Sequence, residues 1–284
     1  EGQWDNHGAF LRHVNDVVRM LRNDGVLGSR DGGRLTNAAA QSGIGKDGRS
    51  GYRWLFDGTA ESLDGWRQAP GGHFELRPDG SLLTRGGLGM LWYAEEEFSD
   101  FSLKLQFRDV STGNTYANSG VFVRFPDPTA AEQPECGQGQ SEAWVAISCG
   151  HEIQLYDGPT GEPQKTGSVY NFAPVTLDEA GVTEKGEWND YEIRVVGQTY
   201  TILRNGEVIN EWENTPGQQS SRAGDPPTDL RQFTSGFIGL QNHGNNDLME
   251  FRNGPGLGAA AAAGRPGALR PNPRKVLSLS CPSN

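Results

Sequence analysis

The sequence predicts an all-β fold, a two-layer β-sandwich preceded by a short helical segment. Several runs alternate apolar and polar side chains with the period of half-buried strands, namely residues 101–110, 119–125, 151–157, 190–212 and 235–243. Asp-Gly and Asn-Gly turns, with 40 glycines and 16 prolines, punctuate the chain. No helical pattern lies between the runs, so antiparallel strands in two packed layers are expected rather than an α/β fold.

Composition divides the chain into three parts. Residues 1–45 carry apolar side chains at spacings of three and four from Phe10 to Leu21, which predicts a helix ending near Gly25 and a second helix over about 29–41. This pair is too small to fold alone, so we expect it to pack on its neighbour or to be the remnant of an upstream enzyme domain. Residues 50–253 hold the sandwich, and residues 254–284 are low in complexity and predicted to be disordered.

Net charge limits the class of partner. A formal charge of -11 and an isoelectric point near 5.0 repel phosphate backbones and anionic lipid, which argues against nucleic acid and membrane surfaces and favours neutral or cationic ligands. No stretch approaches the roughly 18 apolar residues of a membrane span. Zinc-type cysteine and histidine spacing and dense aspartate clusters are missing from the sequence, so no metal and no cofactor are expected.

The cysteines give an indirect indication of the compartment. Cys136 and Cys149 bracket a loop rich in glycine and glutamine, which favours a disulfide over two unpaired thiols and is typical of an exported protein. We therefore expect a secreted or periplasmic location, with Cys281 in the tail left as a free thiol. Closing a loop of this length contributes about 3 kcal/mol in the chain-entropy model.

Polar side chains gather on the non-core faces of four strands. In HEIQLYD, Ile153 and Leu155 take the core side, which turns Glu152 and Gln154 outward. The same parity places further large hydrogen-bonding side chains outward, namely Asn118, Arg124, Gln241, His243, Glu250 and Arg252. Carboxylates, amides and guanidinium groups in this arrangement bind sugar hydroxyls. The alternative is a solvated outer face with cross-strand ion pairs such as Glu152 with Arg124.

Segments in the same order resemble a known family. They are WLFDGTAESLDGW, FSLKLQFR, NSGVFVR, HEIQLYDG, TGSVY, GEWNDYEIRVVG, RNGEVI, GFIGLQNHG and MEFRN. Together these segments, across about residues 52–253, are similar to the 3-keto-disaccharide hydrolase family. The resemblance implies a concanavalin A-like jelly roll with a carbohydrate site on its concave sheet.

The resemblance also implies a mechanism and a set of site residues. A ketone at sugar C3 acidifies the proton on C2, so a base can remove that proton and the resulting enolate can expel the anomeric oxygen. Glu152 or His243 would be the base, the other the proton donor, and Arg124 the enolate stabiliser. Substrate binding would fall to Asn118, Gln154, Asp157, Tyr170, Gln241 and Arg252. We expect one pocket, in which guanidinium charge keeps Glu152 ionised, to bring together Arg124, Glu152, Gln154, Gln241, His243 and Arg252.

Several of these residues have a second interpretation. Asp157 lies at a strand end, where it serves either the site or the following turn, and Tyr170 and Trp188 are either sugar-stacking rings or core residues. Gln154 interrupts the alternating carboxylates of a laminarinase-type enzyme, which weakens the retaining-glucanase interpretation. Three function classes follow: a hydrolase or lyase acting on glycosides, a non-catalytic carbohydrate-binding module of a larger exported enzyme, and a structural or adhesion sandwich.

Overall fold

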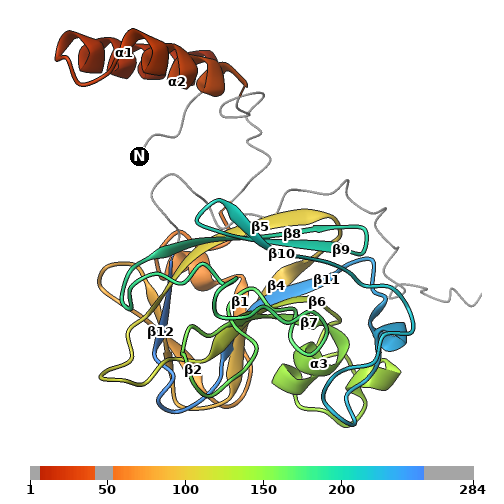
Figure 1. Cartoon of the computed structure of the whole chain (residues 1–284). Coiled ribbons are helices and arrows are strands. Elements are labelled where there is room, and N and C mark those ends of the chain that lie inside the picture. Colours follow the sequence, from red (N-terminus) through yellow and green to blue (C-terminus); the bar gives the residue numbers. More distant parts are fainter. Residues whose placement is uncertain (1–6, 42–53, 253–284) are drawn as a thin grey trace, which may run out of the picture.

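The structure, a computed structural model, describes residues 7–41 and 54–252 (Figure 1). Two antiparallel sheets pack face to face over residues 66–252, which confirms the predicted jelly-roll β-sandwich. Within the described residues, three short 3-10 helices lie in the connections, at Glu61–Leu63, Glu135–Gly137 and Thr228–Arg231.

The first sheet has five strands and carries the candidate site. Its strand order is β1-β4-β11-β6-β7. The bounds are Trp66–Gln68 for β1, Gly89–Phe98 for β4, Gly236–Asn242 for β11, Ser119–Phe125 for β6 and His151–Leu155 for β7. Strand β11, late in the chain, pairs with both β4 and β6, so residues far apart in sequence become neighbours across the sheet.

The second sheet has seven strands, in the order β10-β9-β8-β5-β12-β3-β2. Their bounds are Glu207–Glu213, Thr199–Arg204, Asn189–Val196, Phe101–Asp109, Met249–Arg252, Leu82–Arg85 and His73–Leu76 in that order. The last strand, β12, pairs with β5 and β3 in the middle of this sheet. Strand β12 therefore closes the sandwich even though it is only four residues long.

The core lies between the two sheets and follows the predicted alternation. Val121, Ile153 and Ile238 of the first sheet are buried in one cluster with Leu103 and Ile193 of the second. Burying these side chains stabilises the fold by roughly 1.5–3 kcal/mol each. Because successive side chains on a strand point to opposite faces, this inward set commits Glu152, Gln154 and Gln241 to the outer face of the first sheet.

A helix that the sequence pattern did not predict covers part of that outer face. Helix α3, Glu142–Cys149, packs Ala143 and Ala146 against a second apolar cluster on the sheet. The sheet residues of this cluster are Met90, Trp92, Phe122, Phe125 and Phe237. The predicted disulfide is confirmed: Cys136 and Cys149 are bonded with their Cα atoms 5.3 Å apart, which ties the helix end to the preceding 3-10 turn.

The two N-terminal helices occur where the sequence predicts them. Helix α1, His7–Asn23, ends just before Gly25 at φ +71°, and α2 spans Ser29–Gln41. Within residues 7–41 and 54–252, no helix combines the length and apolarity that membrane crossing requires. The predicted tail 254–284, including Cys281, lies outside the described residues, and the last strand ends at Arg252.

Candidate functional site

Glu152 is the second residue of β7 and lies on the outer face of the first sheet. It is 7% exposed, and its cross-strand partner in β6 is Phe122, while Gly120 is opposite Gln154. A Cβ atom at Gly120 would lie 2.8 Å from Cγ and 2.9 Å from Oε1 of Glu152. The Glu152 carboxyl therefore lies over the bare backbone of Gly120, in space that any larger residue would fill.

Burial controls the ionisation of Glu152. Loss of solvent raises its pKa to about 8, against the positive charge of His243 and a hydrogen bond from the Gln241 side chain, which both lower the pKa. The charge of Glu162 raises the pKa further. The expectation that guanidinium charge keeps Glu152 ionised is therefore wrong, because desolvation dominates and no guanidinium contributes to this shift.

His243 follows β11 and is held by a carboxylate from the next turn. Its Nδ1 lies 2.7 Å from Oδ2 of Asp247, and the other Asp247 oxygen accepts a hydrogen bond from the backbone N–H of Asn118 at 3.0 Å. The bond to Asp247 is the main reason why the pKa of His243 is raised, and Glu152 and Glu162 add to it. His243 is half-exposed, so Nε2 is the ring nitrogen available to exchange a proton.

A loop segment brings two further groups to Glu152. The backbone N–H of Tyr170 donates to the carbonyl of Glu152 at 2.9 Å, and the Tyr170 hydroxyl donates to Oε2 of Glu162 at 2.9 Å. Burial and the Glu162 carboxylate raise the pKa of Tyr170, so its hydroxyl stays protonated. We call the following residues the Glu152 cluster: Glu152, Glu162, Tyr170, Gln241, His243 and Asp247.

Two other predicted residues lie at the same end of the sheet. The backbone N–H of Asn118 donates a hydrogen bond to the Asp247 carboxylate. The buried side-chain Oδ1 of Asn118 has no hydrogen-bond partner among the described residues. Gln154 is 1% exposed on the strand of Glu152, and its side-chain oxygen accepts from the backbone N–H of Leu155 at 3.1 Å. Neither side-chain oxygen is therefore presented to a ligand: that of Gln154 already has a partner, and that of Asn118 is shielded from solvent.

Arg124 does not join the cluster, and the expectation that it lines the same face is wrong. It has φ 57°, and the register of β6 against β11 shifts at this point, so a β-bulge reverses the faces and Phe125 takes the outward place. The buried guanidinium donates to the carbonyls of Phe233, Ser99 and Gly197. Arg124 therefore links three loops through hydrogen bonds to their backbone carbonyls, and its guanidinium is not free to stabilise an enolate.

Arg252 is also separated from Glu152. It belongs to β12 in the other sheet, where its Nε donates to Gln106 at 2.9 Å and its guanidinium lies 3.9 Å from the ring centroid of Trp188. The sequence correctly predicted that Arg252 points away from the core, but β12 belongs to the seven-stranded sheet and not to the sheet of Glu152. Trp188 stacks with Arg108 as well, so this ring serves a contact network on the second sheet.

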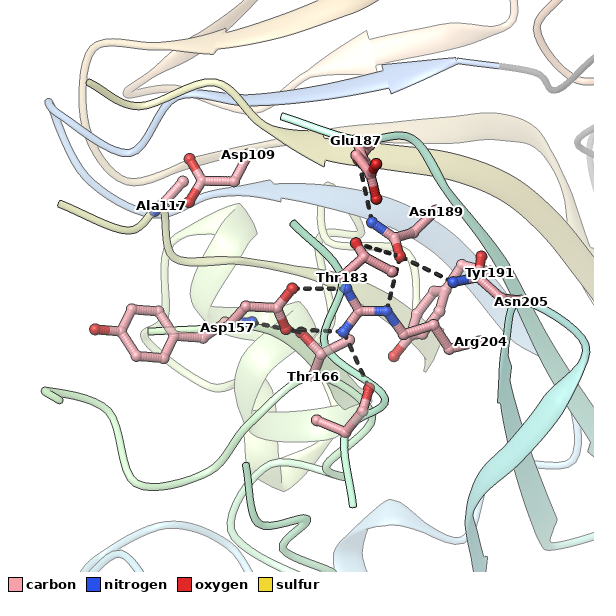
Figure 2. A network of polar contacts seen from close by, with 12 residues as sticks. Asp109, Ala117, Asp157, Thr166, Thr183, Glu187, Asn189, Tyr191, Arg204 and Asn205 are labelled. Carbon is pink, nitrogen blue, oxygen red and sulfur yellow. Dashed lines mark hydrogen bonds and ion pairs between the residues drawn. The ribbon is translucent and has the colours of Figure 1, made fainter. Parts of the chain in front are cut away.

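Asp157 forms a buried ion pair, as Figure 2 shows. Its two oxygens accept from Nη1 and Nη2 of Arg204 at 2.9 and 2.7 Å, and Oδ1 also accepts from Thr166 at 2.7 Å. Arg204 is 2% exposed and further donates to Asn189 and to the carbonyl of Ala180. This network anchors the long β7–β8 connection. Asp157 therefore has neither of the two roles that the sequence suggested, substrate binding or formation of the following turn.

Strand alternation in the sequence did not point to Glu162 or Asp247. Both lie in connections without an alternating pattern, which is why strand parity could not place them. A weak signal existed for Asp247, because it follows His243 by four residues within a short turn. Within the described part of the chain, no group of three His, Cys, Asp or Glu residues is arranged to hold a metal ion.

Geometry and ionisation together give this cluster the groups that proton transfer requires. A buried carboxyl and an imidazole paired with a carboxylate interact electrostatically, and amide and phenol donors lie beside them. Paired groups of this kind act as general acid and base on a bound substrate.

Comparison with known proteins identifies the family. The sequence model of the family described as the 3-keto-alpha-glucoside-1,2-lyase-like domain matches residues 51–254. A solved structure of a provisionally named glycosyl hydrolase from Parabacteroides distasonis ATCC 8503 is 25% identical, with a TM-score of 0.53 over 71% of this chain and 96% of that chain. A second from the same organism, at 22% identity and TM-score 0.51, covers 71% and 91% and shares the fold. A search of curated proteins found no match.

The family match covers the whole sandwich, including every residue of the Glu152 cluster. It confirms the resemblance seen in the ordered sequence segments and gives the protein a carbohydrate-related function. The chain belongs to the 3-keto-alpha-glucoside-1,2-lyase-like domain family.

Proposed function

We propose that the protein cleaves the glycosidic bond of 3-keto-glycosides, including 3-keto-disaccharides, at the Glu152 cluster. The observation that carries this proposal is the buried Glu152 carboxyl, with a pKa of about 8, beside a histidine held by Asp247. A base whose pKa lies near the working pH is both sufficiently ionised and sufficiently strong to remove a carbon-bound proton.

Glu152 acts as the base and His243 as the acid. The Glu152 carboxylate removes the proton from C2, and the electron pair of that bond forms the C1=C2 double bond through the enolate of the C3 ketone. The C1–O bond breaks, and the leaving oxygen takes a proton from Nε2 of His243. The products are an unsaturated keto sugar and a free alcohol, and addition of one water to the double bond completes a hydrolysis.

The Gln241 amide takes over the role that Arg124 cannot perform. One of its two N–H groups donates to the Glu152 carboxyl, which leaves the second N–H for an enolate oxygen. A neutral donor in a water-poor site stabilises a developing enolate oxygen more strongly than the same donor does in water.

A kinetic isotope effect tests the proposal. A 3-keto-glucoside labelled with deuterium at C2 should be cleaved several-fold more slowly than the unlabelled compound, and the unsaturated ketone should be detected by its absorbance. Glu152→Gln should abolish turnover. The matched control is Glu250→Gln, a carboxyl of similar burial on the other sheet, which should keep activity.

Two outcomes would contradict the proposal. Cleavage of ordinary glycosides at the same rate as 3-keto-glycosides would exclude the C2-proton mechanism. Sugar binding by the wild type without any turnover would instead select the carbohydrate-binding module. The disulfide supports export to the periplasm or the cell exterior, and fractionation of the native host would test that location.

A further inference from the structure

A short segment of the β7–β8 connection pairs with the outer edge of β7, the last strand of the first sheet. The backbone N–H of Gly167 donates to the carbonyl of Gln154 at 3.0 Å, and the N–H of Gln154 donates to the carbonyl of Ser168 at 2.9 Å. The backbone N–H of Tyr170 then donates to the carbonyl of Glu152 at 2.9 Å. These bonds place Tyr170 beside the proposed base.

Asn171 reverses the chain directly after Tyr170. Its φ of 68° lies in the left-handed region, which asparagine adopts more readily than most residues. Backbone N–H groups of Phe172 and Ala173 close the turn by donating to the carbonyl of Val169, each at 2.9 Å. Because glycine would satisfy this backbone conformation equally well, the turn alone does not require the asparagine side chain.

The Asn171 side chain joins two loops to this turn. Its Oδ1 accepts from Nε2 of Gln164 at 3.0 Å, and the Asn171 backbone N–H donates in return to Oε1 of Gln164 at 2.7 Å. Toward the other loop, Nδ2 donates to Oδ2 of Asp225 at 3.2 Å, and Oδ1 also accepts from the Ser221 hydroxyl at 3.1 Å. Both polar atoms of the side chain are therefore used inside the protein.

The bonds to Gln164 complete a ring that includes Glu162. The backbone N–H of Gln164 donates to Oε1 of Glu162 at 2.9 Å, and the Tyr170 hydroxyl donates to Oε2 at 2.9 Å. Asn171 is hydrogen-bonded to Gln164 and covalently attached to Tyr170. It thus connects the two residues that hold the Glu162 carboxylate.

The pKa of Glu152 depends on this turn in two ways. Burial is the main cause of its increase, and the charge of Glu162 adds to it, against the charge of His243 and a hydrogen bond from Gln241. The buried Lys165 interacts with Glu162 and offsets part of that charge, so burial remains the larger cause. A turn that moves away admits water and takes Glu162 with it, and both changes lower the pKa of Glu152.

We propose that Asn171 is the positioning residue of the Glu152 cluster, whose side chain holds the Tyr170 turn and the Glu162 carboxylate beside the proposed base. The inference rests on the proposed function, because it names the residue that keeps the base in its working environment. Asn171 acts through Tyr170 and Gln164 and is not itself a catalytic residue.

Titration of the Glu152 carboxyl tests the inference without substrate. Glutamate labelled with carbon-13 at the carboxyl group is incorporated, and the Glu152 resonance is assigned by its loss in Glu152→Gln. Asn171→Gly permits the left-handed backbone but removes the side-chain bonds. The pKa of Glu152 should therefore fall by about one unit in this variant.

Asn205→Gly is the matched control. Asn205 also has a left-handed backbone, with φ 51°, and its side chain accepts from the backbone N–H of Asp190 at 2.9 Å and donates to Asn189 at 3.1 Å. It lies in the turn between β9 and β10 of the second sheet. This substitution should destabilise the protein to a similar extent but leave the pKa of Glu152 unchanged.

Gln164→Leu tests the same contact from the other partner. It removes both bonds between the Gln164 side chain and Asn171, so it should also lower the pKa of Glu152. Combined with Asn171→Gly, it should give a shift smaller than the sum of the two single shifts, because both substitutions break the same contact. Thermal unfolding checks that each variant is folded, and Gln164→Leu carries the test if Asn171→Gly is not.

The outcomes separate this inference from the proposed function. An unchanged pKa of Glu152 in folded Asn171→Gly, or an equal shift in Asn205→Gly, overturns the inference and leaves the proposed function standing. A lowered pKa in Asn171→Gly, together with a wild-type protein that cleaves no 3-keto-glycoside, overturns the proposed function and leaves Asn171 as the residue that holds the turn over Glu152.

Discussion

The carboxyl group of Glu152 lies over Gly120, on the neighbouring strand, so closely that a Cβ atom at Gly120 would lie 2.8 Å from Cγ of Glu152. The contact links a backbone position in β6 to the position of the proposed base in β7. Since a buried side chain cannot move away without losing its own contacts, this relationship sets where the carboxyl can be.

Gly120→Ala should therefore displace Glu152. We expect a loss of kcat of about 100-fold, because a shift of about 1 Å in a catalytic group has that order of effect, and a stability loss of about 1–3 kcal/mol. The control is Gly239→Ala, on the next strand, whose Cβ would meet Met90 and Trp92 at 3.1 Å. It should cost similar stability but much less activity, and equal activity losses in the two variants would contradict the prediction.

The pH dependence of stability should carry the signature of Glu152. Its pKa is raised from 4.5 to about 8 in the folded protein, so the folded state keeps a proton that the unfolded state has lost. The stabilising contribution is complete below about pH 4.5 and declines as the pH rises through 8. Relative to Glu152→Gln, the wild type should thus lose unfolding free energy between about pH 5 and pH 8 in urea titrations; a constant difference would exclude the shift.

Asp247→Asn should lower the pKa of His243, because the bond to Asp247 is the main cause of its increase. The basic limb of the kcat/KM profile, which reports loss of the proton from His243, should move to lower pH. Nuclear magnetic resonance titration of the His243 ring measures the same shift directly. If the pKa of the His243 ring shifts but the basic limb of the kcat/KM profile does not move, His243 is not the proton donor.

Arg124→Ala should affect folding rather than chemistry. It removes buried hydrogen bonds to the carbonyls of Phe233, Ser99 and Gly197, and each acceptor left unsatisfied should cost about 1–3 kcal/mol. Below its lowered melting temperature the variant should retain kcat. A large loss of kcat in protein that circular dichroism shows to be folded would restore a catalytic role for Arg124.

Reduction of the Cys136–Cys149 bond should destabilise the protein by about 3 kcal/mol, because the reduced loop gains freedom in the unfolded state. Paired Cys136→Ser and Cys149→Ser substitutions should reproduce this loss in denaturant titrations. Peptide mapping under non-reducing conditions should recover the two cysteines in one cross-linked fragment. Recovery of both as free thiols would remove the argument for export.

Alternation in the sequence determined which side chains face the core. The inward set Val121, Ile153 and Ile238 and the outward set Glu152, Gln154 and Gln241 follow from the two-residue period of a strand. The disulfide and the two N-terminal helices could also be predicted from the sequence, because they depend on short spacings along the chain. Local periodicity cannot, however, specify which strands become neighbours.

Only the tertiary structure decided the membership of the site. A single bulge with φ 57° turned Arg124 away from Glu152, and the layer of β12 placed Arg252 on the other sheet. Glu162 and Asp247 joined the cluster from connections whose course depends on hydrogen bonds with residues distant in sequence, such as that between Asp247 and Asn118. The physical reason is that parity is a property of one strand, whereas bulges, layers and loop docking follow from packing of the whole chain.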